Sequence, residues 1–306
     1  MLQTVVRVAV FFAFIAAGAV LTRLKRLSRE GVDGLSAYVY WLGFPAWLIV
    51  TFTQLPRPPA TVAVPLIAYV GAMITAAVIA AGAAFLLKAK RDEAMAAGAG
   101  ALVNNSAFLG VPVALSLFGT EAAHLGPIVV AADFLVCFTL ACAVLSLASG
   151  HGLTAALKRT AQNPTVLAAA LGVILMFAGL RFPPAAEGAL DLLGKSGAPV
   201  ALVALGGLLG LMPDRALISF DVPRAVAVTA KLLLAPALVA GVLFLVHADP
   251  ALWRICVFMS ACPTAVSIFI QARVYNVWSE GAAAAVAQGT LISLVTLSAL
   301  AIALQA

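Results

Sequence analysis

The chain has 306 residues, of which 64% are hydrophobic and only 10% are charged, and its mean hydropathy is +1.11. A soluble protein carries about 25% charged residues and about 45–50% apolar ones, so the composition excludes a soluble fold, and it also excludes disorder, which needs polarity. The net charge of +6 does not indicate nucleic-acid binding, because the basic residues lie in short loops between apolar runs. The composition predicts a membrane protein with many spans.

Apolar runs of spanning length predict ten transmembrane helices, since about 20 residues cross a hydrocarbon core of about 30 Å. In chain order these runs lie at about 4–22, 34–54, 62–87, 94–118, 122–148, 164–180, 186–211, 223–246, 252–274 and 282–304.

The basic residues predict the orientation. Arg23, Lys25, Arg26 and Arg29 follow the first run, whereas a secretory signal peptide carries its positive charge before the apolar run. Most other Lys and Arg outside the spans also lie in loops after odd-numbered spans. Because cytoplasmic loops carry the excess of basic residues, we expect these loops in the cytoplasm and both termini outside.

Gly/Pro signals recur about half a chain apart. Gly43-Phe44-Pro45-Ala46 in span 2 matches Gly197-Ala198-Pro199-Val200 in span 7, and Pro112 in span 4 matches Pro263 in span 9. This recurrence predicts two five-helix repeats, residues 1–148 and 164–306, joined by a cytoplasmic linker, 149–163. Because five is odd, the second repeat is inverted, as in many secondary transporters, whose interrupted spans hold the transport site.

Polar residues gather at these interruptions. An asparagine amide can donate two hydrogen bonds to a carboxylate without adding a charge, although such residues also serve as contacts between helices worth about 0.6–2 kcal/mol. The predicted substrate-binding residues are Asn104, Asn105, Pro112, Pro263, Thr264 and Ser267.

Ionisable residues inside spans are costly and need a role or a partner. Asp133 is the acidic residue placed deepest in a span, and we predict a coupling or support role for it and for Gln271; alternatively, a neighbouring hydroxyl satisfies Asp133. Lys231 could snorkel to the cytoplasmic interface or attract anions from that side. No catalytic motif or metal-binding spacing is present, so the sequence predicts neither an enzyme nor a cofactor.

Two segments resemble a known family. Asn105-Ser106-Ala107-Phe108-Leu109-Gly110-Val111-Pro112 is similar to the Asn-x-x-x-(Leu/Met)-Gly-(Ile/Leu)-Pro motif of the auxin efflux carrier family, and Cys262-Pro263-Thr264-Ala265-Val266-Ser267 through Tyr275-Asn276 is similar to its second crossover. The resemblance covers essentially the whole chain. The family includes bacterial malonate and malate permeases and the plant PIN-FORMED carriers.

The resemblance implies an all-α membrane protein of ten helices in two inverted repeats, with broken spans 4 and 9 crossing at their prolines. It implies a scaffold of spans 1, 2, 6 and 7, commonly dimeric, and a transport domain of spans 3–5 and 8–10 that moves like an elevator. Asn105 matches the substrate-facing asparagine, and Asp133 falls at a polar support site. Ser267 replaces a frequent asparagine, span 3 has no acidic residue, and no long central loop is present. A bacterial carboxylate permease is therefore the nearer relative.

These observations predict a permease for small organic anions such as malonate, in the bacterial inner membrane. Its partners would be a carboxylate substrate, the lipid bilayer and a second copy of the chain. The alternative is a sodium-coupled organic anion symporter of bile-acid type, which ranks second because sodium sites need clustered carboxylates and carbonyls.

Overall fold

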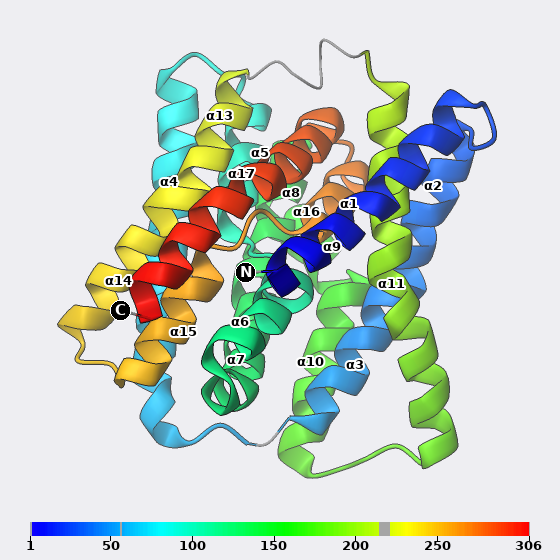
Figure 1. Cartoon of the computed structure of the whole chain (residues 1–306). Coiled ribbons are helices and arrows are strands. Elements are labelled where there is room, and N and C mark those ends of the chain that lie inside the picture. The colour runs from blue at the N-terminus through cyan, green and yellow to red at the C-terminus, as the bar shows by residue number, and fades with distance from the viewer. Residues whose placement is uncertain (1, 56, 214–220, 306) are drawn as a thin grey trace.

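The computed structural model describes residues 2–55, 57–213 and 221–305, and it describes only the backbone of residues 2–11, 112 and 116. Within these ranges the regular structure is helical, and one isolated bridge joins Asn104 to Thr264. Figure 1 shows long helices packed side by side, with most loops at the two ends of the molecule. The all-helical prediction is confirmed for the described residues.

The helices follow the predicted apolar runs closely. The first half contains α1 (Leu2–Arg23), α2 (Arg29–Tyr38), η1 (Val39–Gly43), α3 (Phe44–Gln54), η2 (Ala60–Val62), α4 (Ala63–Leu86), α5 (Arg91–Leu102), η3 (Ser106–Gly110), α6 (Val111–Phe118), α7 (Thr120–Ala132), η4 (Asp133–Phe138) and α8 (Thr139–Ala148). The second half contains α9 (Leu153–Ala161), α10 (Pro164–Ala178), α11 (Pro184–Leu211), α13 (Val222–Thr229), η5 (Ala230–Leu234), α14 (Ala235–Leu245), α15 (Pro250–Ser260), α16 (Val266–Val274) and α17 (Ser279–Gln305).

Six helical runs in the described residues can each cross a membrane, by their length and composition. They are Arg29–Gln54, Ala60–Leu86, Thr120–Ala148, Pro184–Leu211, Val222–Leu245 and Ser279–Gln305. The α9–α10 pair, which is bent by 57°, adds a seventh if it counts as one span. The other predicted spans correspond to α1 and to the interrupted pairs α5–α6 and α15–α16, so the total of ten stays a prediction.

The Gly-Pro signals of predicted spans 2 and 7 do not break their helices, which contradicts the sequence-based expectation. The π-helical turn Val39–Gly43 leads from α2 into α3, where Pro45 lies in the first turn, and α11 continues through Pro199. The π-helical turn before Pro45 widens the helix, which relieves the clash between a proline ring and the carbonyl four residues earlier. The glycines instead bring the two helices together, because a Cβ added to Gly43 would lie 2.8 Å from the Cα of Gly197.

The helices group into two sets by their packing, with α1, α2, α3, α10 and α11 in the first set and α4 to α8, α13 to α17 and the turns η3 to η5 in the second. α1 packs along α11, where a side chain on Gly206 would overlap the carbonyl oxygen of Ile15, and α3 packs against α10 and α11. In the other set, α4 packs against α5 and α14, and α13 packs against α5 and α17. Small residues at such contacts are typical of membrane helices, which associate through close backbone packing.

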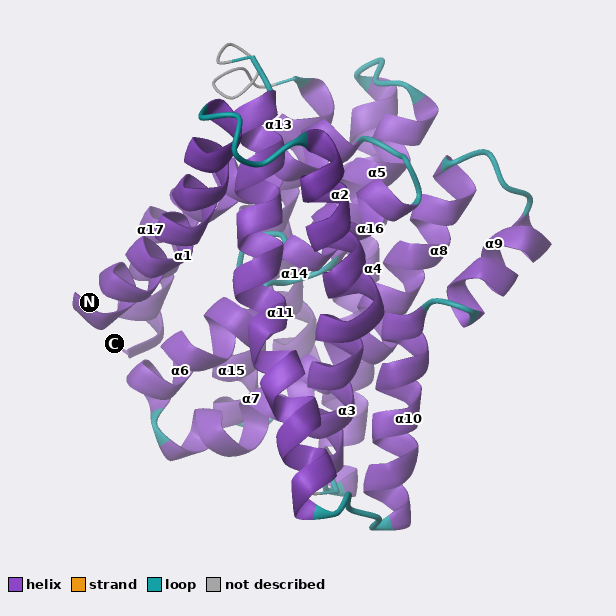
Figure 2. Cartoon of the chain, turned by 90° about the vertical axis from the view of Figure 1, so that its right-hand side faces the viewer, coloured by secondary structure: helices purple, strands orange, loops and turns teal. Residues whose placement is uncertain are grey.

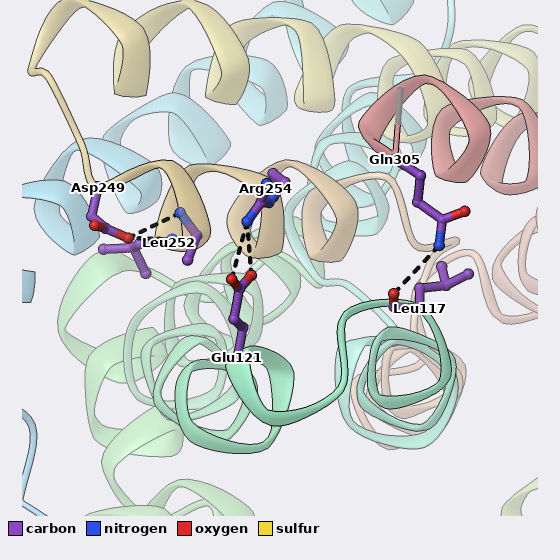
Figure 3. Close-up of polar contacts among 7 residues, drawn as sticks. Leu117, Glu121, Asp249, Leu252, Arg254 and Gln305 are labelled. Atoms are coloured by element: carbon purple, nitrogen blue, oxygen red, sulfur yellow. Dashed lines mark hydrogen bonds and ion pairs between the residues drawn. The ribbon is translucent and has the colours of Figure 1, made fainter.

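Polar contacts join the two halves of the chain at one end of the second set. Arg254 of α15 donates from Nη2 to both carboxylate oxygens of Glu121 of α7, at 2.9 and 3.1 Å, and the Gln305 amide donates to the Leu117 carbonyl at 3.3 Å (Figure 3). Glu121 is therefore paired. Because both side chains of the ion pair are partly exposed, the pair contributes only modestly to the contact between α7 and α15.

Candidate functional site

Two helices break and cross near the middle of the molecule. α5 ends at Leu102 and η3 begins at Ser106, while α15 ends at Ser260 and α16 begins at Val266. The segment that joins α15 to α16 lies at mid-height in Figure 1, and Figure 2 shows loop backbone at the same level inside the bundle. Irregular backbone at membrane depth must be satisfied by protein or water, so such a crossing needs internal partners.

The two breaks supply those partners to each other. The Asn105 N–H donates to the Pro263 carbonyl at 2.8 Å, and the Ala265 N–H donates to the Val103 carbonyl at 3.1 Å. These bonds flank the antiparallel bridge between Asn104 and Thr264. The crossing therefore behaves as a minimal two-stranded sheet inside a helical bundle.

The predicted crossing at both prolines is wrong for Pro112, which lies outside the first break. Pro263 lies within the second break, whereas Pro112 follows the first break and lies in the first turn of α6. The wider π-helical turn Ser106–Gly110 comes directly before α6, and a wide turn relieves the clash that a proline makes with the carbonyl four residues earlier. Pro112 therefore lies inside the helix that begins at Ser106 and does not mark the break.

Asn104 and Asn105 have different surroundings, because Asn104 is the bridge residue, whereas Asn105, with φ −78° and ψ 45°, already turns toward η3. Asn104 shares a face with Thr264, whose hydroxyl donates to the Gly100 carbonyl at 3.0 Å. The Asn104 amide nitrogen donates to Asp133 Oδ1 and Oδ2 at 3.0 and 3.1 Å and to the Tyr69 hydroxyl at 2.7 Å. Asn104 thus belongs to a buried network around Asp133.

Asp133 is completely satisfied in this network. The Tyr69 hydroxyl donates to its Oδ1 at 2.7 Å, and the Ser106 hydroxyl donates to its Oδ2 at 2.6 Å. All three side chains are buried. Ser106 and Asp133 each begin a π-helical turn, η3 and η4, and such turns are frequent at functional sites. Asp133 therefore lies beside the crossing, and its coupling or support role stays a prediction.

Lys231 completes the network, and the expectation that it snorkels to the interface is wrong. Its side chain is fully buried, and its ammonium donates to Asn104 Oδ1 and to the Ser260 carbonyl, the latter at 2.8 Å. Lys231 also lies on a π-helical turn, η5. Neither Lys231 nor Tyr69 was among the predicted site residues, although a charged residue inside an apolar run is itself a functional signal.

Asn105 lies at the crossing, and its side chain has no partner among the residues that the structure describes. Both polar atoms of its amide are buried and make no hydrogen bond, and the same holds for the hydroxyl of Ser267 in the first turn of α16. Buried polar groups in native proteins almost always have partners, so an unpaired amide and hydroxyl beside the two helix starts are well suited to receive a ligand.

A series of contacts between aromatic rings, which includes one ring close to Asn105 in the sequence, connects the two sets of helices. Phe108, three residues after Asn105, stacks on Phe44 with ring centroids 6.0 Å apart and contacts Trp47 at 4.9 Å. Trp47 in turn contacts Phe134 at 5.5 Å. These rings provide an apolar surface near the crossing.

Gln271 lies apart from the Asp133 network. Its Oε1 accepts a hydrogen bond from the Asn163 amide at 2.9 Å, just before α10, while its Nε2 is buried without a partner. The structure therefore does not bring Gln271 together with Asp133, although both were predicted to serve coupling or support.

A polar cavity of about 610 Å³ opens among the loops that follow predicted spans 1, 7 and 9. Its lining includes Asp33 of α2, Arg224 of α13 and Arg273 of α16. Arg273 and Asp33 form an ion pair that links α16 to α2. The cavity thus lies where the two sets of helices meet.

The fold and this crossing define a membrane transport protein. The family model described as "Membrane transport protein" matches residues 3–154 and again residues 151–301. The chain therefore belongs to this family, the auxin efflux carriers, and is a transporter and not an enzyme. Because one model matches each half separately, the chain contains two related halves.

A similar protein is known from Rhizobium meliloti (strain 1021), where it is named "Putative malonate transporter". It is 29% identical over 301 residues, which cover 95% of this chain and 92% of the relative.

Proposed function

We propose that this protein is a secondary transporter that carries small organic anions, such as malonate or another carboxylate, across the bacterial inner membrane. The observation that carries the proposal is the buried Asn105 amide, which is unpaired at the crossing of two broken helices. An amide and a hydroxyl can bind a carboxylate without a fixed charge, and the helix starts at η3 and α16 favour an anion.

Substrate binding is assigned to Asn105 and Ser267, with Pro263 shaping the crossing. Asn104 and Thr264, first predicted to bind substrate, instead support the crossing from its other face. The aromatic surface formed by Phe108 and Trp47 suits the hydrocarbon part of an organic acid. The name of the Rhizobium meliloti relative favours malonate as the first substrate to test.

The proposed architecture has ten spans in two inverted five-helix repeats, with both termini outside and residues 149–163 in the cytoplasm. The set containing α1, α3, α10 and α11 would be the scaffold and the dimer contact. The helices around the crossing would move against it as an elevator. This division is supported by the packing, because the helices of each set contact one another more extensively than they contact the other set.

Uptake by purified protein in proteoliposomes tests the function. Labelled malonate, malate and indole acetate should be compared, with and without ion gradients, for the wild type, Asn105→Ala and Gln162→Ala. Gln162 carries an exposed amide at the end of α9 and serves as the control. We expect uptake of a carboxylate by the wild type and Gln162→Ala, and background uptake by Asn105→Ala. Wild-type transport by Asn105→Ala would remove Asn105 from the site, and a strict sodium requirement would favour the symporter.

A further inference from the structure

A lysine ammonium is held at the crossing by oxygen atoms. Lys231 Nζ donates to the side-chain oxygen of Asn104 and to the backbone carbonyl of Ser260. Carbonyl oxygens of this kind also coordinate transported cations in the unwound helices of secondary transporters. The ammonium therefore occupies an environment of the type that a monovalent cation requires.

The counter-charge lies one side chain away. Asp133 is surrounded by groups that can donate hydrogen bonds to it, namely the Tyr69 and Ser106 hydroxyls and the Asn104 amide, and such donors stabilise an ionised carboxylate. Asn104 joins the two charges, because its oxygen faces Lys231 and its nitrogen faces Asp133. A buried charge without a partner is costly, so each charge accounts for the presence of the other.

The members of this network belong to one set of helices. Lys231 lies on η5 and Asp133 on η4, Asn104 lies within the first break, and Ser260 ends α15 just before the second break. In the proposed elevator these elements move together, so the charge pair would remain intact in every conformation. An ion taken from solution would instead have to bind and leave in each cycle.

We infer that Lys231 is a built-in cation of the transport site, which takes the place of a coupling ion and makes transport independent of sodium. This inference rests on the proposed transport function. Lys231 is a positioning residue in this scheme, because it acts on the substrate through Asn104 and the crossing.

Two measurements test the inference. The first is the initial uptake rate of wild-type proteoliposomes in sodium, potassium and choline media, which should be the same. The second compares Lys231→Met, Asp133→Asn and the double variant in choline medium, with Lys195→Met as the control. Lys195 forms an exposed ion pair with Asp191, so its loss should leave uptake unchanged.

We expect Lys231→Met to lose uptake to near background and the double variant to recover much of it, because removing both charges leaves neither unpaired. The midpoint of thermal unfolding in detergent should fall in Lys231→Met and recover in the double variant. For the wild type this midpoint should be independent of sodium. This readout needs no substrate, so it tests the inference even if no tested carboxylate is carried.

Three results would overturn the inference. They are a sodium requirement of the wild type, wild-type uptake by Lys231→Met, or a double variant that is no better than Lys231→Met in both uptake and stability. Failure of the transport proposal looks different, because the wild type would then carry no tested substrate while the unfolding results still report on the charge pair.

Discussion

Asn104 and Asn105 are neighbours in the sequence, yet the amide of Asn104 uses both of its polar atoms in hydrogen bonds while that of Asn105 uses neither. Asn104 is the bridge residue and bonds to Asp133, whereas Asn105, with φ −78° and ψ 45°, already turns toward η3 and takes no part in this network. One asparagine therefore stabilises the crossing, and the other is available to a ligand.

Alanine variants should separate these two roles. Asn104→Ala leaves Lys231 and Asp133 without a shared partner and should lower the free energy of unfolding by about 1–3 kcal/mol. Asn105→Ala removes an amide with no partner, so it should unfold near the wild-type temperature while losing carboxylate uptake. Thermal unfolding and uptake, measured on the same preparations, check this. Equal stabilities of the two variants would contradict the division of roles.

The positions of the long helices were predictable from the sequence. The predicted runs 62–87 and 186–211 correspond to Ala60–Leu86 and Pro184–Leu211. This succeeds because the hydrocarbon core imposes a local requirement, a continuous apolar stretch whose backbone groups bond within the helix. Asn105 and Asp133 were singled out because polar side chains stand out in apolar surroundings; both lie near the crossing, and the roles predicted for them stay predictions.

The arrangement of the site was not predictable, because its partners are far apart in the chain. Asn104 lies 127 positions from Lys231, and no periodicity reports such a contact. The place of the first break is likewise decided by its pairing with the segment around Thr264, and not by the proline at 112. Gly-Pro motifs signal a special backbone environment, but they do not distinguish a break from a close contact between helices.

The contact of Gly43 with Gly197 predicts opposite effects for two glycine substitutions. Gly43→Ala would press a methyl group against the Gly197 backbone and should destabilise the protein by about 1–3 kcal/mol. Gly34→Ala, in the adjacent helix α2, meets no atom within 4 Å and should be neutral or stabilising by about 0.5–1 kcal/mol. Unfolding midpoints in detergent measure the difference. A Gly43→Ala protein as stable as Gly34→Ala would show that the helices are not in contact here.

The ion pair between Asp33 and Arg273 joins the two sets of helices, so a moving transport domain must break it. Because Asp33 is half exposed, Asp33→Asn should destabilise the conformation that contains the ion pair by at most about 1 kcal/mol. This changes the equilibrium between the two conformations about fivefold. Ser279 lines the same cavity as the ion pair, so a cysteine at this position reports how often the cavity is open. Because Asp33→Asn disfavours the conformation with the open cavity, the rate at which a maleimide labels Ser279→Cys should fall. Glu121→Gln, which breaks a pair within one set, should leave this rate unchanged. An equal response to both substitutions would argue against motion between the sets.

Cysteine labelling in intact cells tests the orientation predicted by the basic loops. The four native cysteines are buried, so labelling should report mainly on an added cysteine. Ala155 of α9 is exposed in the segment between predicted spans 5 and 6, and Ala186 is exposed at the start of α11, on the other side of span 6. We expect an impermeant maleimide to label Ala186→Cys from outside, whereas Ala155→Cys should need a permeant reagent, because the excess of basic residues holds its loop in the cytoplasm. The reverse pattern would invert the orientation and place both termini inside.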